Sequence, residues 1–207
     1  MQHRYLEKTS PFGPRTSFVS VKTRSTHFCE SVHEFDALLW LEFNPEVLSY
    51  ETQKHFEYTH NGRQRRYTAD KYVTLRDLSS FYVEVKSDGA ANKSDFQEKL
   101  WLLQYYFNAA NEELRLETTT DIYNGDAVPN FRRLYRYLAK RLNSELMSRY
   151  RKQFGHFHTT FGELRSSLAK RGYPDHFGHQ LLAHDQIKFD FMSELNGTSE
   201  VWTHDAA

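Results

Sequence analysis

The sequence predicts a mixed α/β domain followed by a smaller, mainly helical domain. Between residues 31 and 119 the patterns run in the order helix, hairpin, strand, helix and strand, which is typical of a β-sheet flanked by helices. After residues 121–130, which are rich in turn formers, the pattern becomes helical and basic. We therefore expect a basic N-terminal arm over residues 1–30, an α/β domain over 31–128 and a helical domain over 129–207.

The overall composition excludes several classes of protein. Lysine plus arginine and aspartate plus glutamate both number 27, so the net charge of 0 gives no support to nucleic-acid binding. Cys29 is the only cysteine, which rules out an intramolecular disulfide and a cysteine-based zinc cluster. No signal-peptide pattern and no apolar run of membrane-spanning length is present, so we expect a soluble, cytoplasmic protein with no membrane partner.

The first 43 residues predict an arm and a helix. Residues 1–30 carry more basic than acidic side chains and contain proline and glycine, which predicts an irregular arm that becomes extended near Ser17–Lys22. Such an arm either follows phosphates or is a solvated terminus. Apolar residues at helical spacing then predict a helix over Ser31–Phe43. Within it, Ser31 and Glu34 fit a capping box, which would be a structural role for Glu34.

A β-hairpin with a basic return strand is predicted next. Tyr50–His60 has the pattern of a strand, and Asn61–Gly62 is a two-residue turn signal. The return strand carries Arg63, Arg65 and Arg66. These arginines would either hold DNA phosphates or mark a solvent-facing edge of the sheet, and the sequence leaves both alternatives open.

The stretch Tyr67–Lys86 predicts two strands and contains the main candidate site. Residues two apart on a strand share a face, so one face of the second strand would pack on the core. The residues expected on that face are Phe81, Val83 and Val85. Glu84 and Lys86 would lie on the other face, together with Tyr82. If the two strands pair, Asp70 of the first strand would converge with Glu84 and Lys86 on one patch of the sheet surface.

Two carboxylates beside an ammonium group are the arrangement that a metal-dependent phosphodiesterase requires. Asp70 would anchor Mg²⁺, for which Mn²⁺ can substitute, because hard divalent cations prefer oxygen ligands. The further ligands would be Glu84 and the carbonyl oxygen of Val85. Lys86 would orient the attacking water and offset the charge that develops on the phosphate.

The remaining chain predicts a helix over Ser94–Ala110, a strand over Leu114–Thr119 and then the helical domain. An amphipathic helix over Phe131–Tyr150 would present a basic face. Its candidate DNA-contacting residues are Arg132, Arg133 and Arg136, although a solvated helix face would have the same composition. Two short helices over 161–170 and 177–184, followed by a predicted hairpin over 187–203, form a weak winged-helix pattern.

These motifs also resemble those of a known family, the TnsA subunit of heteromeric bacterial transposases. The matching segments are Ser31–Glu34, Leu38–Val47, Tyr67–Val73 and Val83–Lys86, within residues 28–125. The resemblance implies a restriction-endonuclease-like fold with Glu34, Asp70 and Lys86 at the catalytic positions, and with Glu34 as a further ligand of the metal. It also implies Mg²⁺-dependent cleavage of double-stranded DNA at the 5′ ends of a transposon, beside a TnsB-type transposase, and a C-terminal domain that contacts a TnsC-type ATPase.

The sequence departs from the family pattern at two positions and leaves two other functions open. Ala69 precedes the aspartate where restriction-type nucleases often have proline, and Glu84 stands where the best-known TnsA has glutamine. The first alternative is a non-catalytic DNA-binding or adaptor protein in which Asp70 and Lys86 form an ordinary cross-strand salt bridge. The second alternative is a stand-alone restriction or repair nuclease of the same fold.

Overall fold

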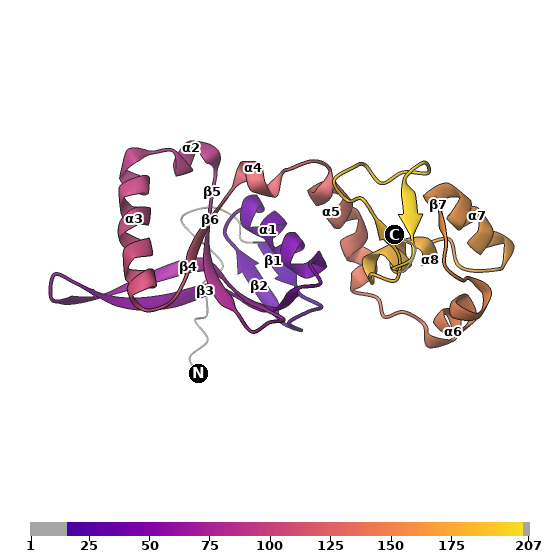
Figure 1. Cartoon of the computed structure of the whole chain (residues 1–207), viewed down its shortest axis with the longest axis horizontal. Coiled ribbons are helices and arrows are strands. Elements are labelled where there is room, and N and C mark those ends of the chain that lie inside the picture. Colours follow the sequence, from indigo (N-terminus) through magenta and orange to yellow (C-terminus); the bar gives the residue numbers. More distant parts are fainter. Residues whose placement is uncertain (1–15, 205–207) are drawn as a thin grey trace. The chain divides into compact units, whose positions relative to one another are not determined.

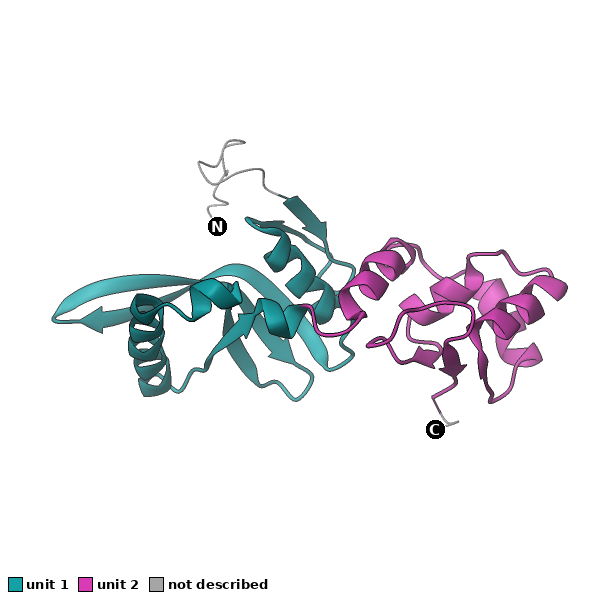
Figure 2. Cartoon of the chain, turned by 90° about the horizontal axis from the view of Figure 1, so that it is seen from above, with its two compact units in different colours: residues 1–122 teal, residues 123–207 magenta. Residues whose placement is uncertain are grey.

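The computed structural model describes residues 16–204, which form two compact units: unit 1 up to Ile122 and unit 2 from Tyr123 (Figure 2). The division lies six residues before the boundary expected from the sequence, because the short helix α4 (Thr119–Ile122) closes unit 1. The Nε1 atom of Trp40 donates a hydrogen bond of 2.9 Å to the carbonyl oxygen of Ile122, which fixes α4 against the first long helix.

Unit 1 is built on a four-stranded mixed sheet, as the sequence predicts. The strands are β3 (Val47–His60), β4 (Arg63–Leu75), β5 (Ser80–Lys86) and β6 (Leu114–Thr118), and they lie side by side in that order. The first three strands are antiparallel, and β6 pairs with β5 in parallel. A parallel neighbour requires a crossover connection, which here consists of the helices α2 (Asp88–Ala91) and α3 (Ser94–Ala109).

Helices cover both faces of the central strands. Figure 1 shows α3 on one side of β5 and β6 and α1 (Val32–Phe43) on the other. Beneath α3 lies an aromatic and aliphatic cluster formed by Phe56, Tyr67, Ala69, Tyr82, Leu100, Leu103, Phe107 and Leu114. Tyr82 and Glu84 are therefore buried as well as Phe81, Val83 and Val85. The expectation that only one face of β5 packs on a core is wrong, because α3 closes the second face.

The segment before α1 is a small hairpin of β1 (Thr16–Val19) and β2 (Thr26–Cys29). The arm predicted over residues 1–30 is thus an ordered hairpin in its second half, and residues 1–15 lie outside the described part of the chain. The hairpin turn is held by the buried carboxylate of Glu42, which accepts hydrogen bonds from the backbone N–H groups of Val21 and Lys22 at 2.8 Å each. These bonds tie the N-terminal hairpin to α1.

The β3–β4 hairpin follows the predicted turn. Asn61 and Gly62 have φ angles of 51° and 70°, the left-handed conformation that a two-residue type I′ turn requires at both positions. Only Gly62 adopts this conformation without steric cost, and asparagine tolerates it better than most residues. The two strands then pair from His60↔Arg63 back to Ser49↔Thr74, and the register shifts by one residue before the last pair, Val47↔Leu75.

The alternation of side chains along β4 is broken at Asp70. Tyr67 and Ala69 pack in the cluster beneath α3, together with Tyr82. Lys71 lies two residues beyond Ala69, so in a regular strand it would share the face of Ala69. It is instead the register partner of Val83, and it therefore lies on the face opposite Tyr82. Gln53, which lies opposite Asp70 in the β3–β4 register, has a φ of 55°. The β3–β4 hairpin therefore twists at this point, and its pairing with β5 ends at Lys71.

The described part of unit 2, residues 123–204, is a group of four helices with a small antiparallel sheet. The elements are α5 (Ala127–Leu138), α6 (Ser144–Gln153), β7 (His158–Thr160), α7 (Phe161–Lys170), α8 (Phe177–Ala183), β8 (Lys188–Phe189) and β9 (Glu200–Trp202). The strands lie in the order β7-β9-β8, so the predicted C-terminal hairpin is confirmed and gains a third strand. The single helix predicted over 131–150 is wrong, because Asn143 starts a new helix by accepting hydrogen bonds from Glu145 and Leu146.

Across the described residues of both units, none of the helices combines the length and the apolar character that would let it span a membrane.

Candidate active site

The Asp70 carboxylate occupies the fork that opens where β4 leaves β5. Its Oδ2 atom accepts a hydrogen bond of 2.7 Å from the backbone N–H of Val85. In a continuous ladder that N–H would bond to a backbone carbonyl of the neighbouring strand. The Asp70 side chain accepts this hydrogen bond in place of a backbone carbonyl. The twist that ends the pairing of β4 with β5 therefore also brings the Asp70 carboxylate to the Val85 N–H.

Glu84 and Lys86 form an ion pair beside this fork. The Lys86 Nζ atom lies 2.6 Å from Glu84 Oε1, and the Glu84 side chain is only 8% exposed. Lys86 Nζ also donates to the carbonyl oxygen of Val85 at 3.2 Å. The ion pair of this lysine is thus made with its neighbour on β5, not with Asp70 across the strands as the adaptor alternative supposes.

Glu34 caps the start of α1. Its Oε1 atom accepts from the Ser31 hydroxyl at 3.0 Å, its Oε2 atom accepts from the Glu30 N–H at 2.9 Å, and the Glu34 N–H donates to the Ser31 hydroxyl at 3.1 Å. At the start of α1, a side chain thus accepts from a helical N–H group and the Glu34 side chain accepts from an N–H group before the helix, as in a capping box. The same carboxylate acts electrostatically on both Asp70 and Lys86, so the cap also lies beside the site.

The site holds more negative than positive charge in a poorly hydrated place. Burial, followed by repulsion from Glu84, raises the pKa of Asp70 to about 7, although the Val85 N–H and Lys86 partly oppose this effect. Burial disfavours the charged form of Lys86, but the hydrogen bond and charge of Glu84 outweigh it and raise the pKa of the lysine. One ammonium group thus faces the carboxylates of Asp70, Glu84 and Glu34, and an added cation would be stabilised there.

The oxygen donors suit a hard divalent cation. Mg²⁺ usually binds through one or two carboxylates and completes its coordination with water and substrate phosphates. Asp70, Glu34 and the carbonyl oxygen of Val85 offer donors of this kind next to an excess of negative charge. Within residues 16–204 no three histidine, cysteine, aspartate or glutamate side chains are gathered as a ready-made metal site. The predicted ligand set, Glu34, Asp70, Glu84 and Val85, therefore stays a prediction.

The predicted DNA-contacting residues fall into two groups. Arg63, Arg65 and Arg66 are exposed on the distal part of the β3–β4 hairpin, and no ion pair involves them in the described part of the chain. Arg65 and Arg66 line a shallow pocket together with Glu57 and Gln64.

The second group belongs to unit 2 and is partly engaged in local structure. Arg133 Nη1 donates to the carbonyl oxygen of Leu195 at 2.6 Å, and Arg136 Nε donates to the carbonyl oxygen of Arg133 at 3.2 Å. The Arg136 guanidinium also lies 5.4 Å from the centre of the Tyr137 ring. Arg132 is exposed on the same helix. Arg133 therefore supports the fold of unit 2, although all three arginines are exposed.

Two features of the site were not predicted from the sequence. The Tyr67 hydroxyl donates a hydrogen bond to Glu84 Oε2. Lys71 is 2% exposed and forms an ion pair with Glu117 of β6. Strand alternation places Tyr67 and Asp70 on opposite faces, so no local pattern could have brought Tyr67 to Glu84. The position of Lys71 within a buried strand was the only sign of this ion pair in the sequence, because a lysine is almost never fully buried without a partner.

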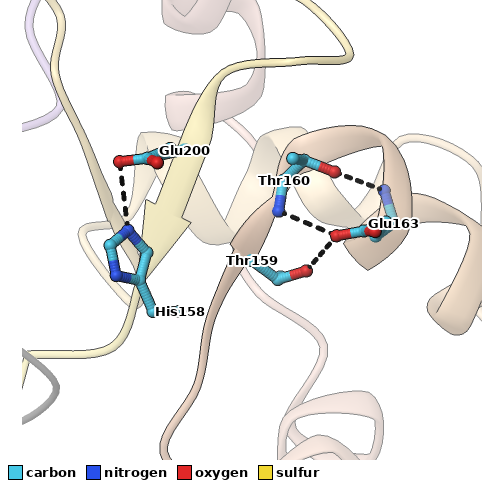
Figure 3. Close-up of a pocket in the computed structure, with 5 residues that line it drawn as sticks. All are labelled: His158, Thr159, Thr160, Glu163 and Glu200. Carbon is cyan, nitrogen blue, oxygen red and sulfur yellow. Dashed lines mark hydrogen bonds and ion pairs between the residues drawn. The ribbon is translucent and has the colours of Figure 1, made fainter.

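A second polar pocket lies on unit 2 and is explained by local structure (Figure 3). Glu163 closes a capping box at the start of α7, where it accepts from the Thr159 hydroxyl at 2.5 Å and the Thr160 N–H at 3.2 Å. His158 and Glu200 face each other across β7 and β9 at 3.3 Å, and both are largely exposed. These contacts stabilise secondary structure, so the fork in unit 1 is the better candidate for chemistry.

We compared the sequence with models of known protein families and with curated proteins, and neither comparison found a match.

Proposed function

We propose that this protein is a Mg²⁺-dependent DNA endonuclease whose active site is the fork around Asp70. The observation that carries the proposal is the position of the Asp70 carboxylate between the backbone of Val85 and the Glu84–Lys86 pair, with Glu34 within electrostatic reach. Carboxylates with a shared excess of negative charge next to one lysine suit metal-assisted phosphodiester hydrolysis. The Glu84 side chain is only 8% exposed, so its pair with Lys86 is not an ordinary surface salt bridge.

Each residue has a defined task in this proposal. Asp70 and Glu34, with the Val85 carbonyl oxygen, would hold the magnesium ion, which would supply Lewis-acid stabilisation of the phosphate and lower the pKa of water. The Lys86 ammonium would lie beside the scissile phosphate, where it would orient water and offset the negative charge of the transition state. Its raised pKa keeps Lys86 protonated at neutral pH.

The fold and partners are part of the proposal. In unit 1, an antiparallel hairpin that leads into a parallel strand, with a helix on each face, is compatible with a restriction-endonuclease-like fold. In unit 2, the order helix, β7, α7, α8, β8, β9 with the sheet order β7-β9-β8 is compatible with a winged helix. All seven residues of α8 are buried, so this helix has no exposed side chain with which to read a DNA groove, which favours a protein partner for unit 2.

We therefore propose that the protein acts as a TnsA-type subunit in a bacterial cytoplasm. It would cut the 5′ ends of a transposon together with a TnsB-type transposase, and unit 2 would bind a TnsC-type ATPase. The motif resemblance supports this assignment, and the arrangement of Asp70, Glu84 and Lys86 is compatible with it.

A cleavage assay on transposon-end DNA with Mg²⁺ tests the function. Asp70→Ala and Lys86→Ala should abolish cleavage and leave folding intact, whereas Asp77→Ala, an exposed acid at the other end of the β4–β5 hairpin, should cut normally. Cleavage at the wild-type rate by either site variant would rule the proposal out. Cleavage by the chain alone would favour a stand-alone nuclease, and cleavage only with the partner proteins would favour the transposase role.

A further inference from the structure

Both oxygen atoms of the Glu84 carboxylate are occupied by protein donors. Lys86 Nζ lies 2.6 Å from Oε1, and the Tyr67 hydroxyl donates to Oε2. Glu84 and Tyr67 are 6% and 9% exposed, so water does not compete freely for these bonds. Hydrogen bonds that involve a charged group are roughly twice as strong as neutral ones, which makes this arrangement costly to break.

The Asp70 carboxylate is arranged differently. Its Oδ2 atom accepts from the Val85 N–H, and no hydrogen bond to Oδ1 is present among the described residues. Asp70 can therefore coordinate a cation without losing a protein partner. Coordination by Glu84 would instead bring a divalent cation onto a carboxylate that already holds an ammonium group at 2.6 Å, and the two positive charges would repel each other.

Tyr67 is firmly placed. Its ring packs edge-to-face on Phe107 with centroids 6.1 Å apart, and Lys99 Nζ lies 5.5 Å from the ring centre. Burial raises the pKa of the Tyr67 hydroxyl far above neutral, so the group remains a hydrogen-bond donor. A fixed donor on β4 thus orients a carboxylate on β5, and that carboxylate in turn orients Lys86.

We propose that Glu84 is a positioning residue that works with Tyr67 to hold the Lys86 ammonium group in place, and that it is not a metal ligand. This inference rests on the proposed nuclease function, and it revises the ligand set predicted from the sequence, which included Glu84. The metal would then be held by Asp70 and by Glu34, whose carboxylate oxygens have only the neutral Glu30 N–H and Ser31 hydroxyl as donors. The Val85 carbonyl oxygen accepts from the Lys86 ammonium group at 3.2 Å, so the same repulsion argues against it as a ligand. The two predictions differ in what happens to metal affinity when position 84 loses its charge.

The test measures Mn²⁺ affinity by isothermal titration calorimetry on the full-length chain and its variants. Glu84→Gln keeps the shape of the side chain, one acceptor for Lys86 and one polar group for Tyr67. We expect Glu84→Gln and Tyr67→Phe to bind Mn²⁺ within about threefold of the wild type, because neither change removes a ligand. Asp70→Asn should weaken binding by about tenfold or more, because it removes the charge of a direct ligand.

The cleavage rate at saturating Mg²⁺, with partner proteins present where they are required, is the second measurement. Glu84→Gln and Tyr67→Phe should each lower this rate about three- to tenfold, the effect of weakening one hydrogen bond that orients Lys86. Glu84→Ala should lower it further, and the glutamine variant provides the comparison if the alanine variant does not fold. Tyr82→Phe removes a hydroxyl from the same buried cluster without touching Glu84 and should cut at the wild-type rate.

Three results are decisive. Loss of Mn²⁺ affinity in Glu84→Gln as large as in Asp70→Asn would show that Glu84 is a ligand, which overturns the inference and leaves the nuclease proposal standing. Unchanged affinity in both variants would overturn the nuclease proposal and the inference with it. Unchanged Mn²⁺ affinity together with an unchanged cleavage rate in Glu84→Gln and Tyr67→Phe would overturn the positioning role alone.

Discussion

At the scale of single residues, Asp70 combines two roles that oppose each other. As the acceptor for the Val85 N–H it completes the β4–β5 junction, but as a carboxylate it is poorly hydrated and lies close to Glu84. The charged form therefore destabilises the fold in the absence of a cation. An unfavourable charge of this kind, which a bound ligand would stabilise further, is common at functional sites.

This opposition predicts a pH dependence of stability that depends on Asp70. Because its pKa is raised to about 7 in the folded state, the folded chain retains a proton that the unfolded chain releases near pH 4. The free energy of unfolding should thus fall as the pH rises from about 4 to 7. Asp70→Asn should flatten this slope and unfold with a free energy roughly 1–3 kcal/mol above the wild type at pH 8 in EDTA.

Urea denaturation at a series of pH values measures this effect. Addition of Mn²⁺ should stabilise the wild type more than the asparagine variant, because the gain from mass action falls as the affinity for the cation falls. A steeper pH dependence in Asp70→Asn than in the wild type would contradict the role assigned to this carboxylate.

Glu34 is the second residue with two tasks, and a matched pair of variants separates them. Ser31→Ala and Glu34→Ala both remove half of the cap of α1 and should each lower the free energy of unfolding by about 1 kcal/mol. Only Glu34→Ala should also weaken Mn²⁺ binding, because Ser31 has no place in the proposed ligand set. Equal Mn²⁺ affinity in the two variants would show that Glu34 caps α1 and does not bind the metal.

At the scale of elements, the β3–β4 hairpin carries exposed arginines and packs against α3. His60 Nδ1 and the Tyr106 hydroxyl are 2.9 Å apart, and the Tyr58 and Tyr106 rings lie with centroids 4.7 Å apart, which fixes the hairpin to α3. Two-stranded ribbons of this kind can enter a DNA groove. Arg63, Arg65 and Arg66 are exposed on this arm and suit phosphate contacts.

The hairpin arginines should therefore govern a salt-dependent part of DNA affinity. Replacing Arg63, Arg65 and Arg66 together by glutamine should weaken binding to double-stranded DNA and reduce the slope of log affinity against log salt by up to about three. Replacing Lys93 and Lys170, two exposed cations outside the hairpin, should have a smaller effect. DNA affinity would be measured by fluorescence anisotropy at several salt concentrations. An unchanged slope in the triple variant would show that the arginines do not contact phosphates and only mark a solvent-facing edge of the sheet.

At the scale of the whole molecule, the chain forms two compact units that each have their own buried side chains. Unit 2 depends on close backbone approaches as well as on apolar packing. The Gly162 N–H donates to the carbonyl oxygen of Gly197 at 2.8 Å, and a Cβ atom on Gly162 would lie only 2.8 Å from that oxygen. The start of α7 and the loop before β9 can meet in this way only because residue 162 has no side chain.

Gly162→Ala should therefore destabilise unit 2. Hydrogen exchange measured by mass spectrometry should show faster exchange within residues 123–204. The added methyl group would force the start of α7 away from the loop that contains Gly197. Gly155→Ala is the matched control, since a Cβ atom there meets nothing within 4 Å. Equal exchange in the two variants would show that this close approach contributes nothing to the stability of unit 2.

The sequence alone determined the features that depend on local chemistry. The helix over 32–43, the Asn61–Gly62 turn, the mixed sheet and the C-terminal hairpin all follow from short-range periodicity and turn preferences, and the structure contains each of them. The capping role of Glu34 was readable for the same reason, because its partners Ser31 and Glu30 are within four residues.

Only the tertiary structure decided how these elements form a site. Strand alternation assumes a straight strand, whereas β4 twists at Asp70 so that the Asp70 side chain replaces a backbone acceptor and Tyr67 reaches Glu84. The burial of Glu84 likewise depends on α3, which covers a face of β5 that sequence periodicity left open to solvent. Both effects arise from contacts between segments far apart in the chain, which no local pattern encodes.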